Sequence, residues 1–368
     1  GRTGWKGCQC WCLDSTGRNV TIWSGFSVIY RWLARHASLA AYRFASPLPT
    51  EPGSLRIAAP PSLGERLQAG FQRLFLRTCF RPLIGPPAGP RLQRALVACL
   101  APLMPGVRGV RRVRRALGGV PAESIIPQGQ AQGQGSSAIL YLHGGAFCLG
   151  NSASHRSITT RLARDAGITV WAPDYRLAPE HPYPAALDDA LACYQALLDS
   201  GTPAHRIVLA GDSAGGGLAL ALALTLRNKG LALPAGLALI SPLTDPSLSS
   251  PSVEANARID PMVRCSWVAQ GIAWYASPLD AGVHAPLTQD LTGMPPILVQ
   301  VGEQEILRDD AWRLAAHARA CGVPCQLEEY TGRWHVFHLQ AFYLRSAAHA
   351  IGHLAAFAQA RMEEAPAD

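Results

Sequence analysis

The sequence predicts an α/β protein in which a mostly parallel central sheet is flanked by helices. Short β-prone runs are followed by a loop and then by an Ala/Leu-rich or Ala-rich helical run, at residues 206–227 and again at residues 296–320. This alternation is typical of parallel sheets whose strands are joined by crossover helices. The chain has 368 residues, of which 48% are hydrophobic and 16% are charged. That length and composition suit one large α/β domain with an accessory piece.

The first of these junctions carries a nucleophile motif. The sequence Gly-Asp-Ser-Ala-Gly at 211–215 lies between a strand-like run at 206–210 and a helix-like run at 218–227. A strand that turns abruptly into a helix holds its serine in a strained turn over the sheet edge, above the helix N-terminus. Side chains two residues before or after the serine would collide with the backbone, which explains both glycines. We interpret Ser213 as a nucleophile; the alternative is a structural glycine turn, because five residues alone are weakly specific.

A serine nucleophile needs an oxyanion site, and the sequence offers one about seventy residues upstream. Residues 136–143 read as a buried strand that is followed directly by a Gly-Gly-Ala sequence. Residues without bulk let backbone N–H groups turn toward the negative charge of a tetrahedral intermediate. The candidate oxyanion residues are Gly144, Gly145, Ala146 and Ala214. We expect the last three to donate their N–H groups and His143 to brace the loop; an ordinary Gly-Gly turn is the alternative.

The general base is expected late in the chain, because hydrolases with this elbow place their triad in the order serine, acid, histidine. Among 11 histidines, His335 lies in a loop between the strand-like residues 325–330 and a long Ala-rich terminal helix. His338 is the nearby competitor, but it falls where a helix is expected to begin. His335 is therefore the predicted base.

The acid is expected after the preceding strand, residues 296–302. Four carboxylates compete there, namely Glu303, Glu305, Asp309 and Asp310. Asp309 and Asp310 directly precede a helical run, so helix capping explains at least one of them. Glu305 lies nearer the strand end, from which a carboxylate can fix the tautomer of His335 and stabilise its imidazolium. Glu305 is the predicted acid, with Asp309 and then Glu303 as alternatives.

Together these segments resemble the signature series of the hormone-sensitive-lipase-like esterases, the bacterial family IV of lipolytic enzymes. The matching stretches are His-Gly-Gly-Ala at 143–146, Asp-Tyr-Arg-Leu-Ala-Pro-Glu-His-Pro-Tyr-Pro-Ala at 174–185, Gly-Asp-Ser-Ala-Gly-Gly at 211–216, Glu-Ile-Leu-Arg-Asp-Asp at 305–310 and His-Val-Phe at 335–337. Their order and spacing agree with the family across about residues 65–360.

The resemblance implies an α/β-hydrolase fold with a helical cap. It also implies hydrolysis of short- to medium-chain carboxylic esters by Ser213, His335 and Glu305 through an acyl-enzyme, and we expect no cofactor and no metal ion. The chain departs from the family pattern twice. Ala146 stands where a third glycine is usual, and Glu305 stands where most members have aspartate. The methyl group of Ala146 could narrow the space for the acyl or alcohol group of the substrate. Glutamate at the position of the acid occurs in a subgroup of the family.

The charge distribution argues against nucleic acid as a partner. Residues 1–120 carry 18 Lys/Arg and 3 Asp/Glu, a net charge of +15, whereas residues 121–368 carry 15 and 22, a net charge of −7. The arginine run from Arg108 to Arg115 is a possible phosphate-binding arm, but no helix-turn-helix pattern and no interleaved aromatic residues accompany it. We expect residues 46–120 to form N-terminal helices of the cap, and residues 121–368 the catalytic domain. A second cap segment is expected at about residues 242–286.

An amphipathic helix is predicted over residues 67–81, and its apolar stripe of Leu67, Phe71, Leu74 and Phe75 is expected to roof the site. A basic amphipathic helix also suits weak association with an anionic lipid interface. Such an interface and a small-molecule ester are thus the expected partners, and the chain is compatible with a homodimer.

Residues 1–45 lack sustained periodicity and helix caps, and we expect a leader of uncertain order that is either disordered or partly non-native. Cys8, Cys10 and Cys12 alternate there with Gln and Trp, a spacing that a metal site can use. The second pair of ligands that a zinc module needs is absent nearby. The other seven cysteines lack the spacing of a disulfide framework, which suits a reducing compartment, and a cytoplasmic location is expected. No apolar run reaches the roughly 18 residues that a membrane span needs.

Two other classes of function remain open from the sequence. Another serine hydrolase, acting on amides, carbamates or lactones, would use the same triad. A ligand-binding protein on this fold would lack the catalytic histidine, whereas His335 is present.

Overall fold

The computed structural model describes residues 53–58, 62–129, 137–276 and 285–363, together with three two-residue strands. Two of these strands, β1 (Cys12–Leu13) and β2 (Asn19–Val20), pair antiparallel within a first unit, Gly1–Ala40. The rest of the expected leader, with Cys8 and Cys10, lies outside the described residues. The second unit, Ala41–Asp368, contains all the other elements.

A ten-stranded sheet runs through the second unit in the order β3-β4-β12-β11-β10-β9-β7-β8-β6-β5. The strands are β3 (Leu48–Pro49), β4 (Ser54–Ile57), β5 (Val110–Leu117), β6 (Val120–Pro127), β7 (Ala138–Leu142), β8 (Thr169–Pro173), β9 (Ile207–Asp212), β10 (Gly236–Ile240), β11 (Ile297–Gly302) and β12 (Cys325–Tyr330). The strands from β4 to β8 in this order are parallel, and β3, β6 and β5 each pair antiparallel. The predicted mostly parallel sheet is confirmed.

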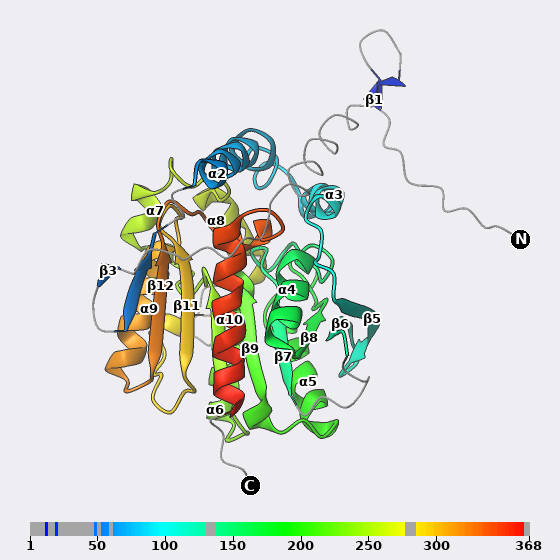
Figure 1. Ribbon diagram of the computed structural model, residues 1–368, viewed down its shortest axis with the longest axis vertical. Coiled ribbons are helices and arrows are strands. Elements are labelled where there is room, and N and C mark those ends of the chain that lie inside the picture. Colours follow the sequence, from blue (N-terminus) through cyan, green and yellow to red (C-terminus); the bar gives the residue numbers. More distant parts are fainter. Residues whose placement is uncertain are drawn as a thin grey trace, which may run out of the picture. The chain divides into compact units, whose positions relative to one another are not determined.

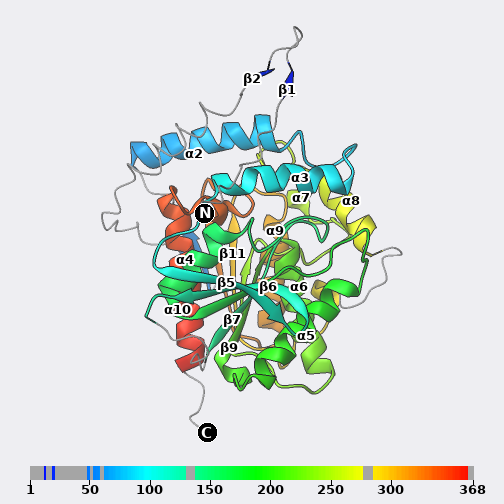
Figure 2. The same cartoon turned by 90° about the vertical axis from the view of Figure 1, so that its right-hand side faces the viewer.

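Helices cover both faces of the sheet (Figures 1 and 2). α4 (Arg156–Ala166) and α10 (Arg345–Glu363) pack against each other on one face. α5 (Ala185–Asp199), α6 (Ala214–Asn228) and α9 (Arg308–Ala320) lie on the other. The central strand β9 is buried along its whole length, as expected for a strand with helices on both sides.

A cap of helices lies beyond the carboxyl ends of the parallel strands, at the top of Figure 1. Its first part is α2 (Leu63–Phe75), the π-helical turn η1 (Leu76–Phe80) and α3 (Pro90–Leu100). Its second part is α7 (Pro251–Ala255) and α8 (Cys265–Tyr275), which fall inside the expected segment 242–286. Among the described residues, no helix has both the length and the apolar character that crossing a membrane requires.

The structure corrects two expectations about the N-terminal third. Residues 46–120 are not only cap helices, because they also supply β3, β4 and β5 to the sheet; the expected boundary at residue 121 cuts the β5–β6 hairpin. The apolar stripe of α2 does not roof the site as a whole, since Leu67 and Leu74 are 64% and 60% exposed. The physical reason is that α2 is held by its polar side, where Glu65 and Gln72 are buried.

Candidate active site

Ser213 occupies the turn that joins β9 to α6. β9 ends at Asp212 and α6 begins at Ala214, so the serine has an unusual backbone conformation with φ 53° and ψ −124°. A Cβ on Gly211 would lie 2.5 Å from the Gly215 carbonyl oxygen, and a Cβ on Gly215 would lie 2.1 Å from the carbonyl oxygen of Leu142. The two glycines are therefore required by close backbone approach, as the motif predicted.

The structure brings Ser213, His335 and Glu305 together from three separate loops. His335 Nε2 lies 2.9 Å from Ser213 Oγ, and His335 Nδ1 lies 3.3 Å from Glu305 Oε1. The imidazole thus bridges the hydroxyl and the carboxylate, and both His335 and Glu305 are buried. Burial alone lowers the pKa of His335, but the nearby carboxylates, above all Glu305, outweigh it and raise the pKa above its ordinary value.

A serine that the sequence analysis missed holds Glu305 in place. Ser241, which follows β10, donates from Oγ to Glu305 Oε2 at 2.8 Å, and the Gly302 N–H donates to the same oxygen at 3.0 Å. Ser241 Oγ also accepts the Val336 N–H, at 3.3 Å. One hydroxyl therefore fixes both the acid and the backbone next to His335.

The competing residues have other partners. Glu303 accepts the Gly332 N–H at 2.7 Å, and so shapes the loop before His335. Asp309 accepts the Ser252 N–H at 2.9 Å, and Asp310 accepts the N–H groups of residues 244 and 245, both at 3.1 Å. The expectation that one of these aspartates caps the helix is wrong, since α9 begins at Arg308 without a side-chain cap.

His338 is buried in the core rather than facing Ser213. Its Nε2 lies 2.9 Å from Gln300 Oε1 in β11. Burial lowers the pKa of His338 to about 3, so this imidazole is neutral near pH 7.

The loop after β7, residues 144–147, carries three of the four candidate oxyanion residues and is called the oxyanion loop. Gly145, Ala146 and Phe147 have positive φ angles of 122°, 51° and 59°. The N–H groups of Gly145, Ala146 and Ala214 have no hydrogen-bond acceptor among the described residues. The Gly144 N–H instead donates to Asp212 Oδ1 at 3.0 Å, which removes Gly144 from the candidate donors.

Asp212 is a second residue whose role was missed. Besides Gly144, its carboxylate accepts the Tyr141 hydroxyl at 2.7 Å and lies 3.3 Å from His155 Nε2. Burial raises the pKa of Asp212, but its interactions with His155 and Tyr141 outweigh burial and lower it. The residue before Ser213 therefore connects the turn after β9 to the loop after β7. Its position inside the Gly-Asp-Ser-Ala-Gly motif was the available signal.

His143 braces this loop from the other side. Its ring stacks on the Tyr175 ring with the ring centroids 4.2 Å apart, and the Tyr175 hydroxyl donates to the His143 carbonyl oxygen at 2.6 Å. Burial and the neighbouring His155 lower the pKa of His143 to about 4. His143 thus supports the loop as a neutral ring.

Comparison with known proteins agrees with this geometry. A family model described as the α/β-hydrolase fold matches residues 139–339. The putative acetyl-hydrolase LipR of Mycobacterium tuberculosis is 34% identical over 304 residues, which cover 82% of this chain and 91% of that protein. An esterase of Acinetobacter venetianus is 40% identical over 246 residues, which cover 66% of this chain and 80% of that protein.

The same relationship holds in three dimensions. The crystal structure of an esterase from the bacterial hormone-sensitive lipase family superposes with a TM-score of 0.75 at 36% sequence identity, covering 82% of this chain and 99% of that one. The chain belongs to the hormone-sensitive-lipase family of α/β-hydrolases. It is a carboxylic ester hydrolase, as are the esterases to which it is similar.

In this esterase, the second cap segment packs directly on the oxyanion loop. The Phe147 ring stacks on Tyr275 of α8 at 3.8 Å, and Tyr183 meets Tyr275 edge-on at 5.8 Å. A Cβ on Gly271 of α8 would lie 2.6 Å from Ala146 Cβ. The absence of a side chain at Gly271 therefore makes room for the methyl group of Ala146, the residue at which the sequence departs from the expected third glycine.

A further buried carboxylate connects the cap to the acid. Asp260 is fully buried and accepts the N–H groups of Met262 and Val263 at 2.9 Å and that of Ile306 at 3.1 Å. Burial raises the pKa of Asp260 to about 6. Because Ile306 follows Glu305, this side chain links the segment just before α8 to the loop that holds Glu305. No motif in the sequence around Asp260 indicated this role.

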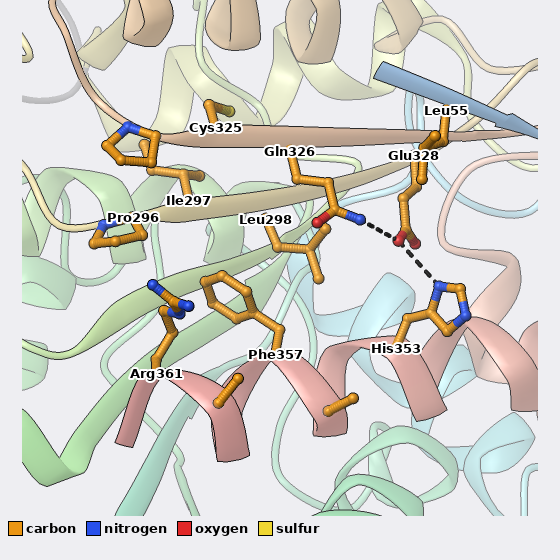
Figure 3. A pocket seen from close by; sticks show the side chains of 13 residues that line it. Leu55, Pro296, Ile297, Leu298, Cys325, Gln326, Glu328, His353, Phe357 and Arg361 are labelled. Carbon is orange, nitrogen blue, oxygen red and sulfur yellow. Dashed lines mark hydrogen bonds and ion pairs between the residues drawn. The ribbon is translucent and has the colours of Figure 1, made fainter. Parts of the chain in front are cut away.

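The esterase also has a hollow of about 550 Å³ far from Ser213, where β4, β11 and β12 extend beside α10 (Figure 3). Glu328 and His353 meet at one end of it, with His353 Nδ1 3.0 Å from Glu328 Oε1. All the oxygens of Glu328 have protein partners, so we assign the hollow no chemistry. Among the described residues, no group of His, Cys, Asp or Glu is arranged to hold a metal ion.

Proposed function

We propose that the chain is a serine carboxylesterase that hydrolyses short- to medium-chain esters through an acyl-enzyme on Ser213. The observation that carries the proposal is the position of His335, with Nε2 2.9 Å from Ser213 Oγ and Nδ1 facing Glu305. A nucleophile, a base and an orienting carboxylate in this order are the requirements for acyl transfer.

In the first half-reaction Ser213 Oγ attacks the ester carbonyl carbon, and its proton passes to His335 Nε2. The carbonyl π electrons move to the oxygen, whose charge is stabilised by the N–H groups of Gly145, Ala146 and Ala214. When the carbonyl re-forms, the bond to the alkoxide breaks, and the alkoxide takes the proton from His335. The alcohol leaves, and the acyl group remains as an ester of Ser213.

In the second half-reaction a water molecule gives a proton to His335 Nε2 and attacks the acyl carbon. Collapse of this intermediate breaks the bond to Ser213 Oγ, which recovers the proton from His335. The carboxylic acid leaves. Glu305 keeps its negative charge throughout and stabilises the imidazolium that forms in each half.

The preference for short chains is supported by the packing around the oxyanion loop. The stacked Phe147 and Tyr275, together with the close contact between Ala146 and Gly271, fill space directly beside the proposed anion site. The relative LipR is named a putative acetyl-hydrolase, which agrees with a small acyl group.

A panel of p-nitrophenyl esters tests the proposal, from acetate through butyrate and octanoate to laurate. We expect kcat/KM to be highest at acetate or butyrate and to fall at laurate. The p-nitroanilide of the best acyl group tests the alternative of an amidase, and we expect much slower turnover. Ser213→Ala is the control, expected to fold normally and to lose all but a residual activity. A folded Ser213→Ala variant with near-native ester turnover would exclude the mechanism.

A further inference from the structure

Helix α2 presents its apolar residues to the solvent. Leu63, Leu67 and Leu74 are 68%, 64% and 60% exposed. Their positions i, i+4 and i+11 lie on one face of the helix, and the exposed Gly70 lies between them. We call these three leucines the leucine stripe. Globular proteins normally turn such a stripe toward the core, so its exposure requires a reason.

The opposite face of α2 is polar and already engaged. Glu65 Oε1 lies 2.8 Å from the guanidinium of Arg333, and Tyr343 donates its hydroxyl to Gln72 Oε1 at 2.6 Å. Rotating α2 to bury the leucines would break this buried ion pair and expose an uncompensated charge to the core. The leucine stripe is therefore held outward by the helix's own polar contacts.

The charge around the stripe selects one kind of partner. Between residues 62 and 122 the sole acidic residue is Glu65, which is buried. Arg66 is exposed and lies beside the leucine stripe by helical spacing. Arg77, in the following turn η1, is also exposed, and its guanidinium donates to the Arg258 carbonyl oxygen. A second copy of the chain would bring the same arginines and no exposed carboxylate to this face. Residues 1–52 fit no better, because they carry 6 Lys/Arg and 2 Asp/Glu.

We propose that the leucine stripe docks on an anionic phospholipid surface. The leucines would enter the boundary between headgroups and acyl chains, and Arg66 and Arg77 would contact the lipid phosphates. α2 lies beyond the carboxyl ends of the parallel strands (Figure 1), and Ser213 directly follows the carboxyl end of β9. Docking there brings the catalytic end of the enzyme to the lipid, and it does not depend on the reaction proposed above.

Sedimentation with vesicles tests the docking with the full chain and without any substrate. Vesicles of phosphatidylcholine alone are compared with vesicles of equal parts phosphatidylcholine and phosphatidylglycerol. We expect binding to the mixed vesicles that weakens at high salt. Leu67→Ser/Leu74→Ser should weaken it roughly tenfold, because two exposed apolar side chains are lost. Arg66→Gln should weaken it about fivefold on the mixed vesicles only.

The matched control is Lys229→Gln/Leu231→Ser. It removes one exposed cation and one leucine, 38% exposed, from the segment just after α6, at the opposite end of the strands. This control should bind like the wild type, and all variants should hydrolyse p-nitrophenyl acetate equally. No binding by the wild type would overturn the proposal. So would equal losses in the control, or a concentration-dependent dimer in the absence of lipid that Leu67→Ser/Leu74→Ser abolishes.

Discussion

The carboxylate of Glu65 lies 2.8 Å from the guanidinium of Arg333, in an ion pair that is almost fully buried. Glu65 also accepts the Ser346 hydroxyl at 2.6 Å, and Arg73 of the same helix donates to the Gly332 carbonyl oxygen at 3.0 Å. Cap helix α2 is thereby fastened to the loop that ends at His335. These contacts connect the cap helix to the segment that carries the proposed base.

Glu65→Gln should therefore destabilise the whole enzyme. It leaves the charge of Arg333 buried without a partner, which costs on the order of 3–5 kcal/mol in the free energy of unfolding. Urea denaturation measures this, and Arg66→Gln, a change at the exposed neighbouring residue, should stay within about 0.5 kcal/mol of the wild type. Similar stabilities for the two variants would show that the ion pair does not hold the cap.

Glu305→Gln should reduce kcat by about 10³–10⁴-fold with little change in KM. The amide oxygen can still accept from Ser241 and Gly302, but its NH₂ then faces His335 Nδ1 and imposes the wrong tautomer. Asp309→Asn should keep near-native kcat and lose about 1 kcal/mol of stability, through its contact with the Ser252 N–H. Exchanged phenotypes would mean that the acid is Asp309.

The pH dependence of kcat/KM should report His335. The base works only when it is unprotonated, and the carboxylates around it raise its pKa above the ordinary value of 6.5. Activity on a soluble ester should therefore rise with pH to a midpoint above 6.5, and Glu305→Gln should move that midpoint down. The same midpoint in both proteins would show that Glu305 does not raise the pKa of the titrating group.

Stability should fall with acid because of His338. Its pKa is about 3 in the folded protein and near 6.5 in the unfolded chain, so the unfolded chain binds the proton first as the pH drops. The stability it contributes is complete above pH 6.5 and is lost as the pH falls toward 3. Between about pH 6.5 and 4.5 the wild type should lose roughly 2 kcal/mol relative to His338→Gln. Urea unfolding at both pH values measures the difference, and a pH-independent difference would contradict the assignment.

The sequence predicted those parts of the site that are encoded in short segments. The elbow at Ser213 needs glycines at fixed offsets, and a strand-loop order places Glu305 and His335 at neighbouring strand ends. Ser241 and Asp260 were missed because nothing in their own neighbourhoods shows that they reach Glu305 or the N–H of Ile306. Their roles arise only when distant loops meet.

The predicted orientation of α2 was wrong for the same reason. Hydrophobic periodicity predicts that leucines face inward, and this rule holds unless a stronger contact decides the rotation of the helix. The deciding contact pairs Glu65 with Arg333, which lies 268 residues away in the chain. A lone glutamate on a cap helix did not reveal that partner.

Covalent labelling tests the central claim most directly. The enzyme is treated with diethyl p-nitrophenyl phosphate, whose phosphorus is attacked by an activated serine with release of p-nitrophenolate, and the labelled peptide is identified by mass spectrometry. The account predicts one diethylphosphoryl group per chain, attached to Ser213, and loss of ester turnover in proportion to labelling. Labelling at another residue, or full turnover by a chain labelled at Ser213, would contradict it.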